Sequence, residues 1–185
     1  MAVRRLALVA LLAGCLWAPI RVSAQRALEY EVKAAYLYNI VNFVTWPPDA
    51  FESPADPVRV CVYGPDPFGS LLDRSIQGGA AGQHPMLAVR VADADGLTKC
   101  HLIFLPVGNT DRVVDQAIRV STQRPILTVG ESPDFLRRGG MIAFVVDGGR
   151  VRFDVNEAAT ASHGLTLSSR LLQVAHSVIG KGRPS

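Results

Sequence analysis

Five short apolar segments set the fold class of this chain. They are rich in β-branched residues and occupy residues 58–63, 86–91, 100–105, 125–129 and 141–146. Segments with helical spacing of apolar residues lie between most of them, and the connections are short. Parallel strands need a crossover connection, and a helix is its usual form. The alternation therefore predicts an α/β fold with a mostly parallel sheet flanked by helices.

The chain after residue 146 predicts a different kind of strand. The Asp-Gly-Gly sequence at 147–149 is typical of a tight hairpin turn, and residues 151–155 alternate strictly between apolar and polar. We expect these residues to return antiparallel as a half-buried edge strand, which completes a sheet of about six strands. Apolar spacing over 171–179 predicts a last amphipathic helix that Gly180 ends.

An aromatic segment at 29–47 precedes the first strand and contains three of the four tyrosines. One apolar stripe at helical spacing consists of Val32, Ala35, Tyr36, Ile40 and Phe43, and a second of Leu37, Val41 and Val44. The two prolines at 47–48 end the pattern, because proline cannot continue a helical hydrogen-bond ladder. We expect a helix that covers one side of the sheet. A second interpretation is that its aromatic residues also line a binding surface.

Residues 1–24 have the layout of a signal peptide. A pair of arginines at 4–5 precedes an apolar run, and Val-Ser-Ala at 22–24 is typical of a cleavage site. The apolar run is shorter than the roughly 20 residues that span a bilayer. A competing signal is Leu-Ala-Gly-Cys at 12–15, which has the form of a lipidation site at Cys15. The layout favours cleavage after Ala24 and an α/β domain over 25–185, and both interpretations predict export to the periplasm.

Cleavage changes the charge and the cysteine content. The chain has 19 basic and 16 acidic residues, but three of the basic residues and none of the acidic ones lie in 1–24. The expected mature chain therefore has as many basic as acidic residues and no basic footprint for nucleic acid. Its two remaining cysteines, Cys61 and Cys100, are expected to form one disulfide in an oxidising compartment. A flavodoxin-like strand order would place the strands that carry them side by side.

The sequence contains no motif of a familiar catalytic site. The loop at 64–69 follows the first strand, where α/β folds bind phosphates, but its two prolines remove N–H groups that a phosphate cradle needs. The chain has no Gly-x-Ser-x-Gly elbow, and its four histidines lack the spacing of zinc ligands. We expect a non-enzyme without metal or cofactor. A hydrolase stays open as a lesser alternative, and it would need Ser or Asp beside His163 or His176.

Seven segments resemble a known family in the same order along the chain. They are Lys-Ala-Ala-Tyr-Leu-Tyr-Asn-Ile-Val-Asn-Phe-Val-Thr-Trp-Pro at 33–47, Val-Cys-Val-Tyr-Gly-Pro-Asp-Pro-Phe-Gly at 60–69, and residues 100–105, 125–129, 139–144, 151–159 and 164–172. The chain is similar over 29–179 to the YfiR-like family of exported proteins.

The resemblance implies a periplasmic repressor that acts on the periplasmic domain of an inner-membrane diguanylate cyclase. Such a repressor lowers cyclic-di-GMP and biofilm formation, an outer-membrane lipoprotein can sequester it, and it is often a homodimer. The implied fold is an α/β sheet flanked by helices, and a disulfide between Cys61 and Cys100 fits it. Some members carry a second cysteine pair in the C-terminal half, which this chain lacks.

The predicted partner or ligand surface combines the aromatic helix with two cations. Its candidate residues are Tyr36, Asn39, Phe43, Trp46, Arg90 and Arg152. The alternative function is a periplasmic small-ligand-binding module with a pocket near Tyr36, Tyr38 or Trp46.

Overall fold

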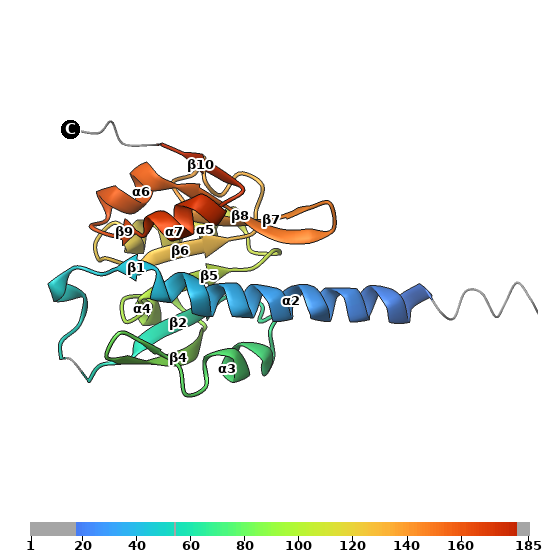
Figure 1. Ribbon diagram of the computed structural model, residues 1–185, viewed down its shortest axis with the longest axis horizontal. Helices are drawn as coiled ribbons and strands as arrows, with labels where there is room; N and C mark the ends of the chain where they lie inside the picture. The colour runs from blue at the N-terminus through green and yellow to red at the C-terminus, as the bar shows by residue number, and fades with distance from the viewer. Residues whose placement is uncertain (1–17, 54, 181–185) are drawn as a thin grey trace, which may run out of the picture.

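The computed structural model describes residues 18–53 and 55–180, with side chains from residue 25 onward (Figure 1). Cys15 and most of the expected signal peptide fall outside these residues. The first described element is the long helix α2 (Ala18–Asn42), whose N-terminal half extends beyond the sheet. The expected cleavage point after Ala24 lies within this helix.

The main sheet has eight strands in the order β10-β8-β7-β6-β5-β2-β4-β3. Along the chain these are β2 (Val58–Tyr63), β3 (Ala80–Ala81), β4 (His84–Val91), β5 (Leu102–Leu105), β6 (Leu127–Gly130), β7 (Ile142–Asp147), β8 (Arg150–Asn156) and β10 (Ser177–Ile179). Only the β7–β8 and β3–β4 pairs of this sheet are antiparallel. The predicted α/β class, with a mostly parallel sheet and an antiparallel hairpin, is confirmed.

The central strands follow the flavodoxin-like order. The chain passes from β2 outward to β4 and then returns to the other side of β2 to form β5. The register pairs Cys61 with Ile103. Strand β2, which contains Cys61, and strand β5, which begins two residues after Cys100, therefore lie side by side as expected. The reversal between β2 and β5 is a topological switch point, where open α/β sheets form a crevice at the carboxyl ends of their strands.

Helices cover both faces of the sheet. They are α3 (Leu71–Ile76), α4 (Ala94–Leu97), α5 (Asp111–Ser121), α6 (Glu157–Ser162) and α7 (Ser169–Val174), with a short 3-10 helix η1 (Pro48–Ala50). Leu102 and Phe104 of β5 pack in the same apolar cluster as residues of α2, α3 and α7. Ile103 and Leu105 pack in a second cluster with residues of α4 and α5. Strands that are buried on both faces explain why their sequences are continuously apolar.

Helix α2 differs from the expectation in its buried face and in its end. Its buried apolar positions are Tyr30, Ala34, Leu37, Ile40 and Val41, whereas Val32 and Ala35 are exposed. The helix ends at Asn42, because β1 (Val44–Thr45) pairs antiparallel with β9 (Thr166–Leu167). The expectation that it runs to Pro47 was wrong. Both apolar stripes fit helical spacing, and the stripe of Leu37, Val41 and Val44 is the one whose residues are all buried.

The C-terminal segment also corrects the sequence prediction. Helix α7 ends at Val174 because Ala175 has an extended conformation, with ψ of 143°. Residues Ser177–Ile179 then pair parallel with β8 as strand β10. The expected helix over 171–179 was therefore wrong, and β8 is an inner strand, not an edge strand.

Asp-Pro at 66–67 and Ser-Pro at 132–133 each have the pattern of an N-cap followed by proline at the first helical position, which predicts a helix at each place. The first helix is shorter than predicted, and the second is missing. Helix α3 begins at Leu71, because Asp66 forms a local turn in which its carboxylate accepts a hydrogen bond from the Phe68 N–H at 2.8 Å. Residues 132–138 form turns instead of the expected short helix. The hairpin turn at 147–149 forms as predicted, and Gly148 and Gly149 both have positive φ, at 55° and 74°.

Candidate functional site

The predicted surface residues on α2 have different environments. Tyr36 is half-buried between α2 and the sheet, where its ring centroid lies 5.6 Å from that of Phe153 and 6.0 Å from that of Phe144. Phe43 is also half-buried and packs against the main core. Asn39 is exposed, and its side-chain amide donates to the Ala35 carbonyl of its own helix at 2.8 Å. Of these three residues, only Asn39 is exposed, so they do not form one exposed surface.

The two predicted cations do not meet. Arg90 lies on β4 and Arg152 on β8, and four strands separate these two in the sheet. Arg90 pairs with Asp66 at 2.9 Å and with Asp73 at 2.7 Å. Hydrogen bonds from Arg90 lower the pKa of the Asp73 carboxyl. Arg90 thus joins the loop after β2 and helix α3 to β4, whereas Arg152 is exposed.

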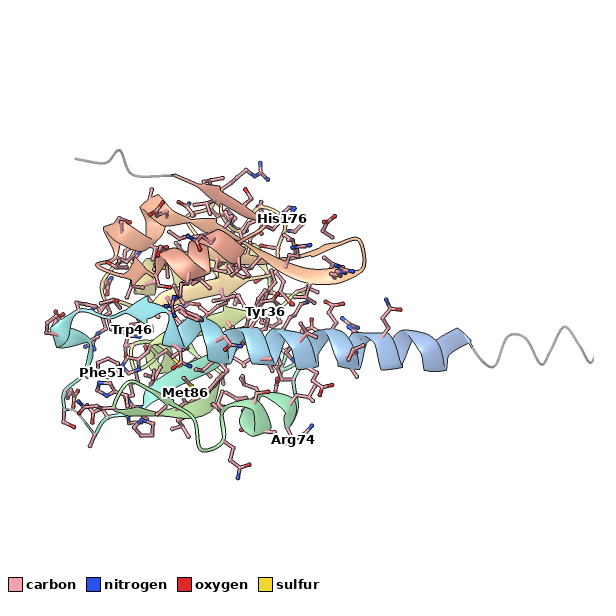
Figure 2. The ribbon with its side chains drawn as sticks, in the orientation of Figure 1. Tyr36, Trp46, Phe51, Arg74, Met86 and His176 are labelled. Atoms are coloured by element: carbon pink, nitrogen blue, oxygen red, sulfur yellow. A yellow bond between two sulfur atoms is a disulfide. The ribbon has the colours of Figure 1, made fainter. Side chains whose placement is uncertain are left out.

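Trp46 borders a groove of about 840 Å³. The groove lies beside the first residues of β4, where its lining also includes Asn42, Phe51, Gln83 and His84. Tyr36 and Tyr38, the other aromatic residues considered for a ligand pocket, are not part of its lining. The Trp46 Nε1 atom is buried and has no hydrogen-bond acceptor among the described residues. Figure 2 shows Trp46 and Phe51 close together, at the end of the molecule opposite the protruding part of α2.

Stacked rings form one wall of the groove. Phe51 stacks on His84, with centroids 3.7 Å apart, and on His101 at 4.5 Å. Trp46 meets His101 edge-on at 5.9 Å. The Arg59 N–H donates to His101 Nδ1, and His101 Nε2 lies 3.1 Å from the Ala50 carbonyl, so we assign the neutral tautomer with a proton on Nε2. Burial lowers the pKa of His101, which favours this neutral state.

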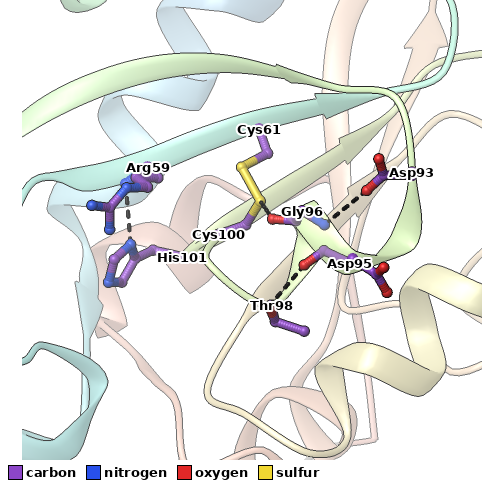
Figure 3. The surroundings of a disulfide bond; sticks show 8 residues. All are labelled: Arg59, Cys61, Asp93, Asp95, Gly96, Thr98, Cys100 and His101. Atoms are coloured by element: carbon purple, nitrogen blue, oxygen red, sulfur yellow. Dashed lines mark hydrogen bonds between the residues drawn. A yellow bond between two sulfur atoms is a disulfide. The ribbon is translucent and has the colours of Figure 1, made fainter.

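The disulfide joins Cys61 on β2 to Cys100, whose Cα atoms lie 5.9 Å apart (Figure 3). Both cysteines are buried in the apolar cluster on the α4 and α5 side of the sheet. The Asp93 carboxylate caps the adjacent helix α4 by accepting from the Gly96 N–H at 3.0 Å. The expected disulfide is therefore present and holds the β4–β5 crossover on the sheet.

A buried ion pair lies at the carboxyl ends of β5 and β6. Glu131 follows β6, and its carboxylate accepts from Lys33 Nζ on α2, from the Tyr30 hydroxyl at 3.2 Å and from the Val107 N–H at 2.8 Å. The side chains of Lys33 and Glu131 are only 4 % and 3 % exposed. Burial, followed by the charge of Glu131, raises the pKa of Tyr30 to about 12. Sequence reasoning missed this cluster, although Lys33 shares its face of α2 with the buried Tyr30 and Leu37.

A crevice of about 430 Å³ lies beside this cluster at the switch point. Its lining includes Arg26, Tyr30, Asp66 and Val107 together with three prolines, Pro65, Pro67 and Pro106. Prolines have no backbone N–H, and both Asp66 carboxylate oxygens accept hydrogen bonds from within the protein. The three prolines therefore offer no backbone N–H donors to a phosphate at this crevice.

The histidines considered for hydrolysis lie outside both cavities. The Ser162 hydroxyl lies 3.1 Å from His163 Nδ1, but it also donates to the Ala159 carbonyl at 2.8 Å. His176 Nδ1 lies 2.8 Å from Asp154 Oδ1. None of these side chains lines the groove or the crevice, so no observation favours the hydrolase alternative.

The described part of the chain contains no cluster of three His, Cys, Asp or Glu side chains that could hold a metal ion. Within residues 18–53 and 55–180, no helix combines the length and the apolar character needed to cross a bilayer.

A model of the YfiR/HmsC-like family matches residues 30–176. The chain belongs to the YfiR/HmsC-like family. The YfiR/HmsC-like region begins at Tyr30 on α2 and ends at His176, just before β10, so it includes the disulfide and the Lys33–Glu131 pair.

Two solved structures share a partial likeness with this YfiR/HmsC-like chain. One is a conserved domain protein from Vibrio cholerae O1 biovar El Tor, with 14 % identity and a TM-score of 0.49 over 65 % of this chain and 54 % of that one. The other is the ABC domain in complex with L-Trp from Streptococcus pneumoniae, with 10 % identity and a TM-score of 0.48 over 71 % of this chain and 57 % of that one. The chain thus spans a little over half the length of each.

Proposed function

We propose that this protein is a non-catalytic periplasmic regulator that binds the periplasmic domain of an inner-membrane diguanylate cyclase and restrains it. Restraint lowers cyclic-di-GMP and thereby biofilm formation. The observation that carries the proposal is the family match, which spans nearly the whole described domain. An outer-membrane lipoprotein that sequesters the regulator, and a homodimeric state, belong to the same proposal.

The solvent side of α2 supports a protein-binding role. Leu28, Val32, Ala35 and Asn39 are exposed and recur at spacings of four, three and four residues, so they lie on one helix face. Leu28 is 61 % exposed and Val32 is 38 % exposed. An apolar helix stripe of this spacing is a common docking element for a groove on a partner. Of the predicted surface residues, Asn39 belongs to this stripe, which we assign to the cyclase.

The test measures cyclic-di-GMP in a strain whose partner cyclase is intact. Deleting the gene for this protein is expected to raise cyclic-di-GMP, and the wild-type gene is expected to restore the lower level. A Val32→Asp variant should bind the isolated periplasmic domain of the cyclase more weakly, because it places a charge in an apolar contact. Val174→Asp is the matched control, since Val174 is 64 % exposed and lies on α7, away from the stripe.

Two results would count against the proposal. Unchanged cyclic-di-GMP after gene deletion would refute the regulatory role itself. Equal weakening of cyclase binding by Val32→Asp and Val174→Asp would refute the assignment of the stripe while leaving the regulatory role in place. Thermal unfolding of both variants shows whether each has kept its fold.

A further inference from the structure

The groove beside Trp46 has the size and the position of an independent binding site. Its volume of about 840 Å³ falls within the range of about 300–1,000 Å³ that is typical of small-molecule sites. It lies near the N-terminal end of β4, whereas the switch-point crevice lies beyond the carboxyl ends of β2 and β5. The groove is therefore separate from the crevice, and its lining does not include the exposed stripe of α2.

Aromatic rings make up one side of this groove. Trp46, Phe51 and His84 are all half-buried, so each leaves part of its surface open to the groove. The stack of His84, Phe51 and His101 holds Phe51 between two parallel rings. Both nitrogens of the His101 ring are bound to backbone groups, which keeps the stack in place. The groove thus has a rigid aromatic wall before any ligand arrives.

The polar side chains that line the groove include no lysine or arginine. Asn42, Thr45, Glu52 and Gln83 are exposed and line the groove. The Asn42 amide nitrogen donates to the Tyr38 carbonyl at 2.9 Å, which leaves its oxygen available as an acceptor. The described lining contains one carboxylate, Glu52, and no lysine or arginine. A phosphate or carboxylate ligand would lose hydrating water in the groove without gaining an ion pair to a lysine or arginine of the lining.

The aromatic and polar side chains of this lining match the two kinds of surface on a sugar. The C–H groups on the face of a sugar ring carry partial positive charge and pack on the negative face of an aromatic ring. Sugar hydroxyls both donate and accept, as do the side-chain amides of Asn42 and Gln83, while Glu52 accepts. We propose that the groove binds a neutral oligosaccharide, with a sugar ring against Trp46 and hydroxyls bonded to Asn42, Glu52 and Gln83. The proposal does not depend on restraint of a cyclase.

Trp46 provides a direct reporter of binding. It is the only tryptophan in residues 25–185, so tryptophan fluorescence of a protein that begins at residue 25 comes from the groove. Cellotetraose and tetra-N-acetylchitotetraose serve as neutral probes, and tetragalacturonate serves as the anionic one. We expect saturable titration by at least one neutral probe, seen both in fluorescence and in calorimetry, and weaker or no binding of the anionic probe.

Two variants test whether the sugar binds in the groove, and a third controls for effects of a surface substitution elsewhere. Gln83→Ala and Asn42→Ala each remove exposed polar groups of the lining, and each is expected to weaken binding about three- to tenfold, the equivalent of one or two hydrogen bonds. Gln173→Ala removes an exposed amide on α7 and should leave binding unchanged.

The proposal is overturned if neither neutral probe binds at about 10 mM, a concentration well above typical weak-site affinities. It is also overturned if tetragalacturonate binds as tightly as the neutral probes, or if Gln173→Ala weakens binding as much as Gln83→Ala. None of these outcomes bears on cyclic-di-GMP levels, so a failure here is distinguishable from a failure of the regulatory role.

Discussion

The buried Lys33–Glu131 pair allows a quantitative prediction. We consider Glu131→Leu, which replaces the carboxylate by an apolar side chain of similar volume. The change leaves the Lys33 side chain, which is 4 % exposed, with Glu29 as its one remaining ion-pair partner among the described residues, and the Glu29 side chain is itself 31 % exposed. It also removes the acceptor of the Tyr30 hydroxyl and of the Val107 N–H. Three donors from two parts of the chain, α2 and the loop after β5, therefore lose one shared acceptor.

The expected loss follows from the cost of an uncompensated buried charge. Removing one partner of a buried pair costs about 3–5 kcal/mol, which already includes relaxation and entry of water. We therefore expect Glu131→Leu to lower the free energy of unfolding by about 4 kcal/mol. Lys33→Met should cost a similar amount, because Glu131 then keeps only two neutral donors. The double variant Lys33→Met with Glu131→Leu removes both charges and should recover most of the loss, to within about 1–2 kcal/mol of the wild type.

Urea denaturation followed by far-UV circular dichroism measures all four proteins, and the double-mutant cycle isolates the coupling between the two sites. Asp111→Asn is the matched surface control, because the Asp111 side chain is 90 % exposed in its pair with Arg138 and should leave the urea midpoint nearly unchanged. The reasoning is refuted if either single variant costs less than about 1 kcal/mol, or if the double variant is as unstable as the sum of the single ones.

Three further predictions concern other parts of the fold. Replacing Cys61 and Cys100 by alanine opens a loop of 39 residues and should lower the free energy of unfolding by about 4 kcal/mol in the chain-entropy model. The urea midpoint of this variant should be lower than that of the oxidised wild type, and equal midpoints would contradict the prediction. Burial lowers the pKa of His101 below its usual value of 6.5, so the unfolded chain takes up the proton first, and stability should fall as the pH drops below about 6.5. Comparing urea midpoints at about pH 7.5 and pH 5 tests this, and His101→Gln should show a smaller difference than the wild type if His101 is responsible. Gly140→Ala would place a methyl group 2.3 Å from the buried Phe135 ring and should lower the free energy of unfolding by about 1–3 kcal/mol. A thermal midpoint at or above that of the wild type would show that the ring can move aside.

The sheet could be predicted from the sequence because its signals are local. Each central strand is buried on both faces, so its apolar character shows in a run of four to six residues without knowledge of its neighbours. The hairpin turn at 147–149 could also be predicted, because only glycine readily adopts the positive φ of Gly148 and Gly149. The pairing of Cys61 with Cys100 could be expected because residues 25–185 contain no other cysteine.

The errors arose where one local pattern permits two structures. Residues 171–179 have helical apolar spacing, but the backbone groups of Ser177–Ile179 find partners on β8, and a strand forms there instead. On α2, helical spacing alone could not decide which stripe faces the sheet. The position of β2 and β5 beneath the helix decides it, because Tyr30, Leu37 and Val41 pack there.

The candidate sites were harder to foresee, because they join residues that are distant in sequence. Trp46 was chosen for its residue type, but its groove needs Gln83 and His84 from the start of β4. Lys33 and Glu131 lie 98 residues apart, and neither stands in a motif. Arg90 and Arg152 were chosen together as cations, and the strand order places them far apart.

The sequence by itself determined the α/β class, the disulfide and the hairpin at 147–149. Each of these depends on which residues are present and on their near neighbours in the chain. Only the tertiary structure decided which face of α2 is buried, which strand forms the edge and which charges meet. The physical reason is that burial and ion pairing depend on contacts between distant segments, and these exist only once the sheet has brought the segments together.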